Sequence, residues 1–460
     1  MVIEIACRLT GIGKPRELDD PFVGFSELQP LFELSELGDR YEIPKARRKF
    51  FNEDSFAASK PPGTFRIFCL GGSTVQGRPF QKETSFTTFV ELGLNVAASS
   101  RDWEVINCGG ISYASYRLVP ILEECLDYEP DLIILCTGHN EFLEERSYGH
   151  LRNVAPLAAA PMKVAFQLSS FHAARNLFVS EPDDLVRRRS ELGPDVQARL
   201  DFRNGLDAYE RDDEWRTGVM RHFEFNINRL LRTAKRAGVP VLIAQPPSNL
   251  ADTPPFKSLP RAGITESELA EHAALLEKAR RLQKTDRYAA VAALEASLKI
   301  DDRQASVHYQ MARLLESLGE TSRARDSFVL ARDHDICPLR ILSPMAESLK
   351  AAADGWQVPL LDVHGLLEKK TDEGILDGVW LVDHVHPSVD GHQQIALALM
   401  EKLGREKLVA LKGNWRTDAS TAMRSHVDSI PDVYFLKGEQ RLQNLRDWTR
   451  GLAEPTDTSK

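Results

Sequence analysis

The stretch Thr64-Phe65-Arg66-Ile67-Phe68-Cys69-Leu70-Gly71-Gly72-Ser73-Thr74 decides the fold. It begins as an apolar run rich in aromatic and branched side chains, which is typical of a buried strand. Glycines and a serine end the run, and residues 84–97 then carry apolar side chains at helical spacing. The pattern predicts a strand, a tight turn and a helix. Ser73 then lies at the carboxyl end of a strand, where open α/β sheets place their ligand sites.

Taken alone, this turn is compatible with a reactive serine and equally with a helix N-cap, because serine is a favoured capping residue. It is not a Walker-type phosphate loop, since no Gly-Lys-Ser/Thr follows. It also lacks the second glycine of a Gly-x-Ser-x-Gly turn. The function therefore depends on whether the rest of the chain supplies partners for Ser73.

The composition indicates a soluble globular protein with room for two or three domains, because the chain has 460 residues, of which 42% are hydrophobic and 27% charged. A net charge of −9 argues against nucleic acid as the main partner. The six cysteines show no C-x-x-C or histidine spacing, so we expect no metal, and those in apolar runs are expected to be buried thiols. No apolar run is long enough to span a membrane.

Further strands are expected after the first, and each ends in a glycine-rich or polar turn. Their ranges are 103–108, 131–136, 239–245 and 358–363. Helices are expected between them at 117–126, from Met220 to Gly238, and at 390–403. Alternation of strands and helices predicts an α/β protein with three layers, α/β/α, around a mostly parallel five-stranded sheet. The turns then gather polar residues along one edge of that sheet.

Other parts of the chain have weaker patterns. Residues 1–60 show no sustained period and are expected to wrap the next domain as an extended arm. Residues 142–215 follow a strand end closely and are predicted to form a lid or insertion over the site, although a packing helix fits them equally well. Residues 411–460 are polar with scattered aromatics and are expected to form a tail packed on the surface.

Residues 264–335 are expected to be entirely helical, with an internal period of 34 residues. Ala290, Leu294 and Ser297 recur as Ala324, Phe328 and Ala331. Small and large residues at this period resemble the tetratricopeptide repeat. The match is poor in the first helix of each pair, so an unrelated helical hairpin remains open. Two repeats are fewer than usual and would rest on a neighbouring domain.

The chain also contains partners suited to a nucleophilic serine. A serine hydroxyl needs a base to take its proton and a third group to orient that base. Asp383 and His386 have a spacing that lets the carboxylate reach one ring nitrogen while the other faces the site. The Gly110 region can supply a backbone N–H and Asn140 an amide to an oxyanion. Two alternatives remain open. Asn140 and Asp383 could instead be helix N-caps. His384 and His392 are rivals of His386 as the base, although His392 is expected at the surface of its helix.

These blocks, in this order, resemble the SGNH (GDSL-like) hydrolase superfamily. Its Gly-Asp-Ser, glycine, Gly-x-Asn-Asp and Asp-x-x-His-Pro blocks are similar to four short segments of this chain, and the resemblance covers about half of the chain. The segments are Gly71-Gly72-Ser73-Thr74, Asn107-Cys108-Gly109-Gly110, Gly138-His139-Asn140-Glu141 and Asp383-His384-Val385-His386-Pro387. The resemblance implies a flavodoxin-like fold, no cofactor, Ser73 as nucleophile, His386 as base and Asp383 as its orienting partner. It also implies oxyanion donors at Ser73 N–H, Gly110 N–H and Asn140.

Two departures from the family pattern bear on the site. Gly72 stands where the family has aspartate. The glycine block is one residue longer than its commonest form, so Ser112 rather than Gly110 could supply the backbone N–H.

The resemblance implies a hydrolase domain in two parts, 61–260 and 336–410, with the helical segment 264–335 inserted between them. The inserted helical segment resembles that of a bacterial subgroup with tetratricopeptide repeats, whose members often begin with a membrane anchor. If this protein is anchored in the same way, it is expected to face the periplasm. We therefore predict hydrolysis of a short-chain acyl or carbohydrate O-acetyl ester, with the helical segment as a binding surface for a protein partner. Two alternatives stay open: a polysaccharide O-acetyltransferase using the same residues, and a repeat scaffold whose serine site is vestigial. A nucleotide-binding fold has little support.

Overall fold

The computed structural model describes residues 20, 22–146 and 191–452, and the chain divides into two compact units. In the first unit, strands β1 (Gly24–Phe25) and β8 (Glu191–Leu192) pair in parallel. The second unit comprises 30–143, 197–213 and 219–460, and it contains the elements discussed below, except for residues 214–218 of one long helix, which belong to the first unit. Of the predicted lid at 142–215, residues 147–190 lie outside the described part of the chain.

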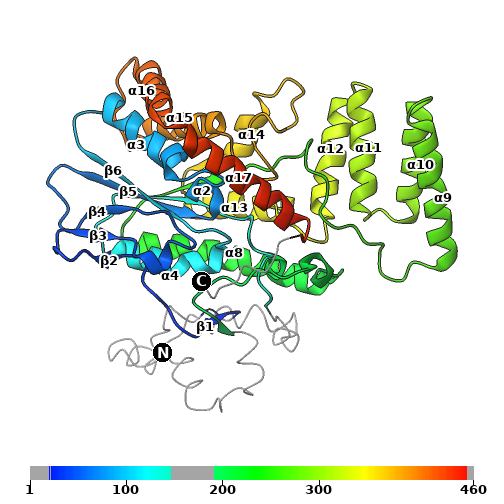
Figure 1. The fold of residues 1–460 in the computed structure, drawn as a ribbon, viewed down its shortest axis with the longest axis horizontal. Coiled ribbons are helices and arrows are strands. Elements are labelled where there is room, and N and C mark those ends of the chain that lie inside the picture. Colours follow the sequence, from blue (N-terminus) through cyan, green and yellow to red (C-terminus); the bar gives the residue numbers. More distant parts are fainter. Residues whose placement is uncertain (1–19, 21, 147–190, 453–460) are drawn as a thin grey trace, which may run out of the picture. The chain divides into compact units, whose positions relative to one another are not determined.

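A five-stranded parallel sheet forms the centre of the second unit, in the order β10-β9-β7-β5-β6 (Figure 1). Its strands are β5 (Phe65–Gly71), β6 (Trp103–Gly109), β7 (Leu132–Cys136), β9 (Val241–Gln245) and β10 (Leu360–Asp362). They fall within the predicted ranges or extend them by one residue, and the predicted α/β class is confirmed. Because β6 and β7 lie on opposite sides of β5, the strand order reverses there, and open α/β sheets bind ligands at such a point.

Helices cover both faces of the sheet, as Figure 1 shows. On one face, α3 (Phe86–Ala97) packs against α15 (Val389–Arg405) and α16 (Trp415–Ser429). On the other face lie α4 (Ser115–Leu126) and α8 (Asp213–Arg236). The sheet is therefore the middle of three layers, and its interior strands are apolar on both sides, as buried parallel strands require.

The segment before the sheet differs from its prediction. Residues 30–60 are not a purely extended arm but contain a three-stranded antiparallel sheet of β2 (Glu33–Leu34), β3 (Arg40–Glu42) and β4 (Ser55–Ala57). The Phe56 ring meets the Phe68 ring of β5 edge-on, with 5.3 Å between centroids. Aromatic burial against the core orders this segment, although its strands are too short to produce a detectable period in the sequence.

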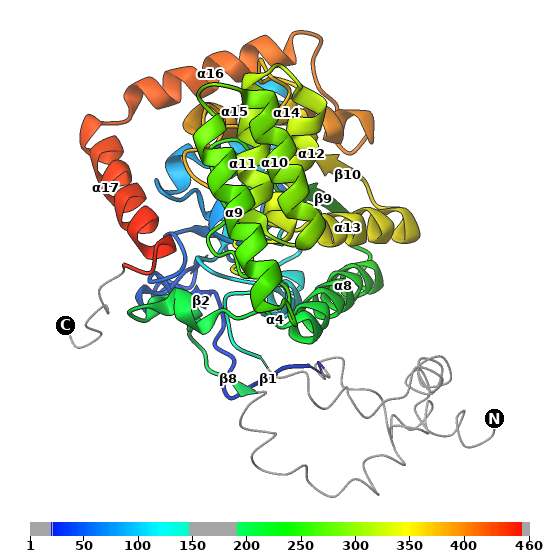
Figure 2. The same cartoon turned by 90° about the vertical axis from the view of Figure 1, so that its right-hand side faces the viewer.

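The polar C-terminal segment folds into two helices, α16 and α17 (Asp432–Thr449), where the sequence suggested only a surface-packed tail (Figure 2). Helix α16 buries Ala419 and Met423 toward α3. Gly438 of α17 packs so closely on the Phe80 ring that an added Cβ would lie 2.1 Å from it. Few apolar positions are needed for these contacts, which explains why the sequence pattern did not reveal the helices.

Residues 264–335 are helical, as predicted, and form two pairs of packed helices (Figure 2). They are α9 (Glu266–Leu282), α10 (Arg287–Ile300), α11 (Ala305–Ser317) and α12 (Thr321–Asp333). All six residues of the predicted 34-residue period are buried. Their identity as a tetratricopeptide repeat stays a prediction.

The remaining helices are short connections and one longer packing helix. They are α2 (Ser73–Gln76), α13 (Ser343–Trp356), α14 (Val363–Glu368) and the 3-10 turns η1 (Lys45–Arg47), η2 (Lys82–Thr84), η5 (Arg199–Asp201) and η6 (Gly205–Ala208). Among the described residues, no helix combines the length and apolar character needed to cross a bilayer.

Candidate active site

The turn after β5 is shaped by two glycines that admit no side chain. A Cβ on Gly71 would lie 2.1 Å from the Cys136 carbonyl oxygen, so the backbones of β5 and β7 can approach this closely only at glycine. A Cβ on Gly72 would lie 2.5 Å from the Asn140 amide nitrogen. An aspartate at position 72 would therefore displace Asn140.

Ser73, His386 and Asp383 form one chain of hydrogen bonds. The Ser73 Oγ lies 2.7 Å from His386 Nε2, and His386 Nδ1 lies 2.7 Å from Asp383 Oδ2. All three side chains are largely buried. The serine comes from the end of β5. Asp383 and His386 come from the turn before α15, and they follow Ser73 by 310 and 313 positions in the sequence. The structure thus brings together the three residues that the sequence spacing singled out.

Asp383 is held in its ionised form. Burial by itself would raise its pKa, but the neighbouring His386 and His384 and the hydrogen bonds to the carboxylate outweigh burial and hold the pKa well below its usual range. Its Oδ1 accepts the backbone N–H groups of Val385 and His386, each at 2.9 Å. These bonds fix the carboxylate against the imidazole. The assigned tautomer then has the Nδ1 proton toward Asp383 and leaves Nε2 to accept the serine proton.

The two rival histidines are placed differently. His384 Nδ1 lies 3.5 Å from Asp383 Oδ1, and burial lowers the His384 pKa to about 4, so its ring is neutral near pH 7. His392 was expected at the surface, and that expectation is wrong: its side chain is fully buried where α15 packs on α3. His392 Nδ1 accepts the Phe86 N–H at 3.2 Å. Neither rival contacts Ser73 Oγ.

Donors for an oxyanion converge on the same turn. The Ser73 N–H is at the first position of α2, where helical N–H groups have no intrahelical partner, and it makes no hydrogen bond within the described part of the chain. The Asn140 amide donates to the Tyr113 carbonyl oxygen at 3.0 Å and lies against Gly72. One amide proton is used in that bond, and the second is left for a ligand.

The backbone N–H of Gly110 does not fit the role expected of it. It donates to the Gly71 carbonyl oxygen at 3.0 Å, continuing the β5–β6 ladder. Ser112, the alternative, has a φ of 62°, and its N–H makes no hydrogen bond to any residue that the structure describes. A positive φ is rare for serine and reorients the peptide of this turn. Ser112 therefore replaces Gly110 as the backbone donor candidate.

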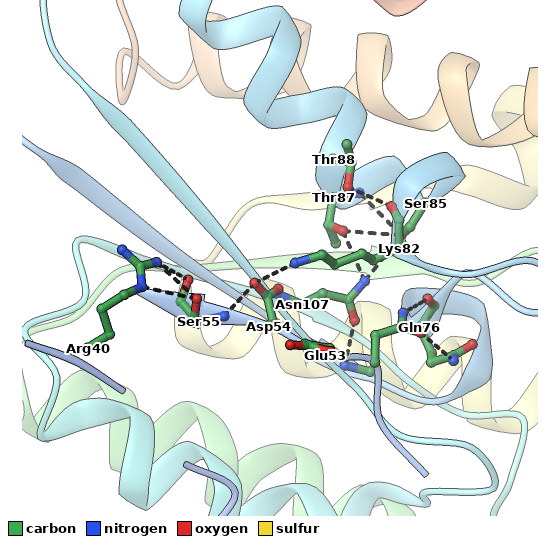
Figure 3. Close-up of polar contacts among 12 residues, drawn as sticks. Arg40, Glu53, Asp54, Ser55, Gln76, Lys82, Ser85, Thr87, Thr88 and Asn107 are labelled. Atoms are coloured by element: carbon green, nitrogen blue, oxygen red, sulfur yellow. Dashed lines mark hydrogen bonds and ion pairs between the residues drawn. The ribbon is translucent and has the colours of Figure 1, made fainter. Parts of the chain in front are cut away.

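Asn107 supports the turn that carries Ser73. The sequence pattern did not indicate this role. The Asn107 amide donates to the Val75 carbonyl oxygen at 2.8 Å, and its backbone N–H donates to Asp54 Oδ2 at 2.9 Å. Lys82 in turn contacts Asp54 Oδ1 at 3.0 Å (Figure 3). The polar network ties the turn after β5 to β6 and to the segment before the sheet. Its only sequence signal was a polar residue inside an apolar strand.

His139, next to Asn140, is a second residue without an assigned role. Its Nδ1 accepts the Ile341 N–H at 3.0 Å, which places the ring proton on Nε2. Burial lowers its pKa far below the ordinary histidine value, so the ring is neutral. Gly138 beside it has a φ of 137° and packs against Ile341. These contacts fix the backbone from which Asn140 projects.

No cluster of three or more potential metal-ligating side chains occurs among the described residues. The described cysteines are buried free thiols, as was predicted for those that lie in apolar runs: Cys69, Cys108, Cys125, Cys136 and Cys337. Burial raises the pKa of the Cys69 and Cys136 thiols, so both are poor nucleophiles at neutral pH. Ser73 is the side chain of this site that has a base within hydrogen-bond distance.

Comparison with known proteins gives remote structural likenesses. No protein-family model matches the chain, and no curated protein does. A solved lipase/acylhydrolase from Enterococcus faecalis is similar at 9% identity, with 76% of this chain and 97% of that chain covered and a TM-score of 0.34. A GDSL-like lipase from Bacteroides thetaiotaomicron is similar at 11% identity, with 77% and 93% covered and a TM-score of 0.31. At such values these likenesses carry no weight for function, which rests on the site itself.

Proposed function

We propose that this protein is a serine hydrolase of the SGNH type, which cleaves a carboxylic ester through an acyl-serine intermediate. The observation that carries the proposal is the buried chain from Ser73 Oγ to His386 to Asp383, with 2.7 Å at each link. The stability of a buried serine does not require a histidine–aspartate pair beside it, so this chain of hydrogen bonds favours a catalytic role for Ser73. Its placement at the switch point of the sheet, with the Asn140 amide against the same turn, suits acyl transfer.

In the acylation half-reaction, Ser73 Oγ attacks the ester carbonyl carbon while its proton passes to His386 Nε2. Asp383 stays ionised and stabilises the imidazolium that forms. The oxyanion accepts hydrogen bonds from Ser73 N–H, Ser112 N–H and the free amide proton of Asn140. Collapse of the tetrahedral intermediate breaks the bond to the alcohol oxygen, which takes the proton from His386.

In the second half-reaction, water enters the place of the alcohol. His386 Nε2 takes a proton from the water as its oxygen attacks the acyl carbon, and collapse of the second tetrahedral intermediate returns that proton to Ser73 Oγ. The products are a carboxylic acid and the regenerated serine. Apart from the ester and one water molecule, no group outside this chain is needed to balance either step.

The test is hydrolysis of p-nitrophenyl acetate and butyrate by the wild type, Ser73→Ala and His386→Ala. Each substitution should lower kcat by about 10⁴-fold, or to the background rate, because triad members act as a unit. Ser425→Ala, an exposed position on α16, is the matched control and should keep the wild-type rate. A Ser73→Ala variant that keeps its far-UV circular dichroism and its activity would refute the proposal.

A further inference from the structure

Arg78 lies directly beside the nucleophile turn. It follows Gly77, the residue that ends α2 with a φ of 97°. The Arg78 backbone N–H donates to the Ser73 carbonyl oxygen at 3.1 Å. The position of the Arg78 backbone is therefore set by the same turn that positions the nucleophile.

The Arg78 guanidinium has no partner in the described part of the chain. It forms no hydrogen bond and no ion pair there, and its Nε is buried without an acceptor. The Arg78 side chain is half-buried, and burial is the main cause that lowers its pKa, so part of the cation is removed from water. A desolvated cation without an acceptor is unfavourable, so a ligand that supplies one would be bound with a gain.

Helix α17 brings two more arginines to the same place. Arg441 Nη1 donates to the Pro79 carbonyl oxygen at 3.4 Å, and Arg446 Nη2 donates to the Val382 carbonyl oxygen at 3.2 Å. Pro79 is next to Arg78, and Val382 is next to Asp383. Neither arginine forms an ion pair with a described carboxylate. We call Arg78, Arg441 and Arg446 the arginine cluster.

The contacts of α17 hold the cluster in place. Gly438 packs against Phe80 at a distance that excludes any side chain, and the Tyr434 hydroxyl accepts the Gln81 N–H at 3.0 Å. The same hydroxyl lies 2.9 Å from Thr84 Oγ1. The helix is thus fixed to the segment that follows Ser73, and this holds Arg441 beside Pro79 and Arg446 beside Val382.

The nearby carboxylates are already engaged. Asp383 and Asp201 are the acidic groups that act on Arg78, and Arg441 acts on it as a second cation. Asp383 is bound to His386 and two backbone N–H groups. Asp201 accepts the Trp448 indole N–H and the Ala198 N–H, each at 2.9 Å. Neither carboxylate forms an ion pair with an arginine of the cluster within the described residues, and the three arginines outnumber the two acidic groups.

We propose that Arg78, assisted by Arg441 and Arg446, binds a carboxylate carried by the ester substrate. A guanidinium presents paired N–H donors that match the two oxygens of a carboxylate, and adjacent cations strengthen the attraction. The inference rests on the proposed ester hydrolysis and names its substrate class: an ester with an acidic group near the scissile bond. That group is carried on the acyl side, as in a dicarboxylic monoester, or on the alcohol side, as in an O-acetylated acidic sugar.

Two pairs of matched esters test the proposal. p-Nitrophenyl hemisuccinate against p-nitrophenyl butyrate places the carboxylate on the acyl side. p-Acetoxybenzoate against its methyl ester places it on the alcohol side. The wild type should favour the charged member of one pair in kcat/KM, mainly through a lower KM. In Arg78→Gln, the charged-to-neutral ratio of that pair should fall about 10- to 100-fold, as expected for charge-assisted hydrogen bonds.

Further variants separate binding from structural effects. Arg78→Lys should restore part of the ratio, and Arg441→Gln should lower it less than Arg78→Gln. Arg280→Gln, an exposed arginine on α9, is the matched control and should leave the ratio unchanged. Circular dichroism shows whether each variant folds. If Arg78→Gln does not fold, the charged-to-neutral ratio of kcat/KM in Arg441→Gln and Arg446→Gln tests the proposal instead.

The outcomes distinguish this inference from the proposed function. Ser73-dependent hydrolysis with no preference for either charged ester overturns the carboxylate site and leaves the hydrolase intact. An equal loss on charged and neutral esters in Arg78→Gln also overturns it, because Arg78 would then act through Asp383. A wild type that hydrolyses none of the four esters and is not labelled at Ser73 by a fluorophosphonate overturns both.

Discussion

Two glycine turns follow neighbouring strands of the sheet and serve opposite purposes. The turn after β5, Gly71-Gly72-Ser73, presents a side chain: its glycines lie against the Cys136 carbonyl and the Asn140 amide, and Ser73 projects to His386. The turn after β6, Gly109-Gly110-Ile111-Ser112, presents backbone. Its Gly110 N–H completes the ladder, and Ser112 at positive φ leaves its own N–H unbonded within the described chain. Similar sequences thus present the proposed nucleophile in one turn and the proposed backbone donor in the other.

The largest effect is expected from a substitution that disrupts the turn after β5. Gly71→Ala should destabilise the fold by about 3 kcal/mol or more and abolish ester hydrolysis, because its Cβ would overlap the backbone of Cys136 at 2.1 Å. Urea unfolding measures the loss. Gly413→Ala, where an added Cβ has open space, is the control and should be nearly neutral. Equal stability of the two variants would show that the turn can relax, contrary to this account.

The next effect concerns the amide shared by both turns. Asn140→Ala should lower kcat by about 10² to 10³-fold with little change in KM, because Asn140 is expected to act on the oxyanion in the transition state. Steady-state kinetics with p-nitrophenyl butyrate provide the measurement. A change in KM alone would indicate that Asn140 binds the substrate in its ground state instead.

The first long helix after each turn, α3 or α4, has its first turn anchored by a different kind of group. This difference provides a pH test. The Phe86 N–H at the start of α3 donates to neutral His392, while the Ser115 N–H at the start of α4 donates to the Glu141 carboxylate at 2.7 Å. Burial lowers the His392 pKa to about 3, below its value in the unfolded chain. The unfolded state therefore takes up the proton first, and the stabilisation present above pH 6.5 is lost as pH falls toward 3.

Between pH 6.5 and the lowered pKa of His392, this residue should reduce the free energy of unfolding by about 1.4 kcal/mol for each pH unit. His392→Asn keeps an acceptor for Phe86 without a titrating group, so its melting temperature should fall less steeply between pH 6.5 and 4.5. His426→Asn, at a part-buried histidine on α16, is the comparison variant. An unchanged slope in His392→Asn would show that His392 is not the neutral anchor described above.

The smallest effect sharpens the role of the second turn. Ser112→Gly should keep ester hydrolysis within about threefold and raise stability by up to about 1 kcal/mol, because glycine adopts positive φ without strain. Only the backbone N–H is expected to act there. A loss of activity comparable with that of Asn140→Ala would instead assign the function to the Ser112 hydroxyl.

The sequence was sufficient for the sheet and for the side chains of the site. Buried parallel strands are continuous apolar runs, and the polar residues at their ends identify one edge of the sheet, so Ser73, Asn140 and the Asp383–His386 pair could be found from order and spacing. The backbone donor could not be chosen between Gly110 and Ser112, because the direction of an N–H depends on φ angles and ladder bonds that residue types do not specify.

Other features depend on contacts between distant segments. His392 looked exposed because its helix neighbours are polar, yet the packing of α15 on α3 buries it. The arginine cluster carries no motif, since the contacts of α17 with the segment after Ser73, among them that of Gly438 with Phe80, place its members near one another. The strands of 30–60 are two or three residues long, which is too short for an alternating pattern.

The most direct test of the central claim is peptide mapping after reaction with a fluorophosphonate. The account predicts one covalent adduct, on Ser73, which is absent in Ser73→Ala and forms far more slowly in His386→Ala, because His386 takes the proton of the attacking hydroxyl. An adduct on another residue, or ester hydrolysis by a folded wild type whose Ser73 stays unlabelled, would contradict it.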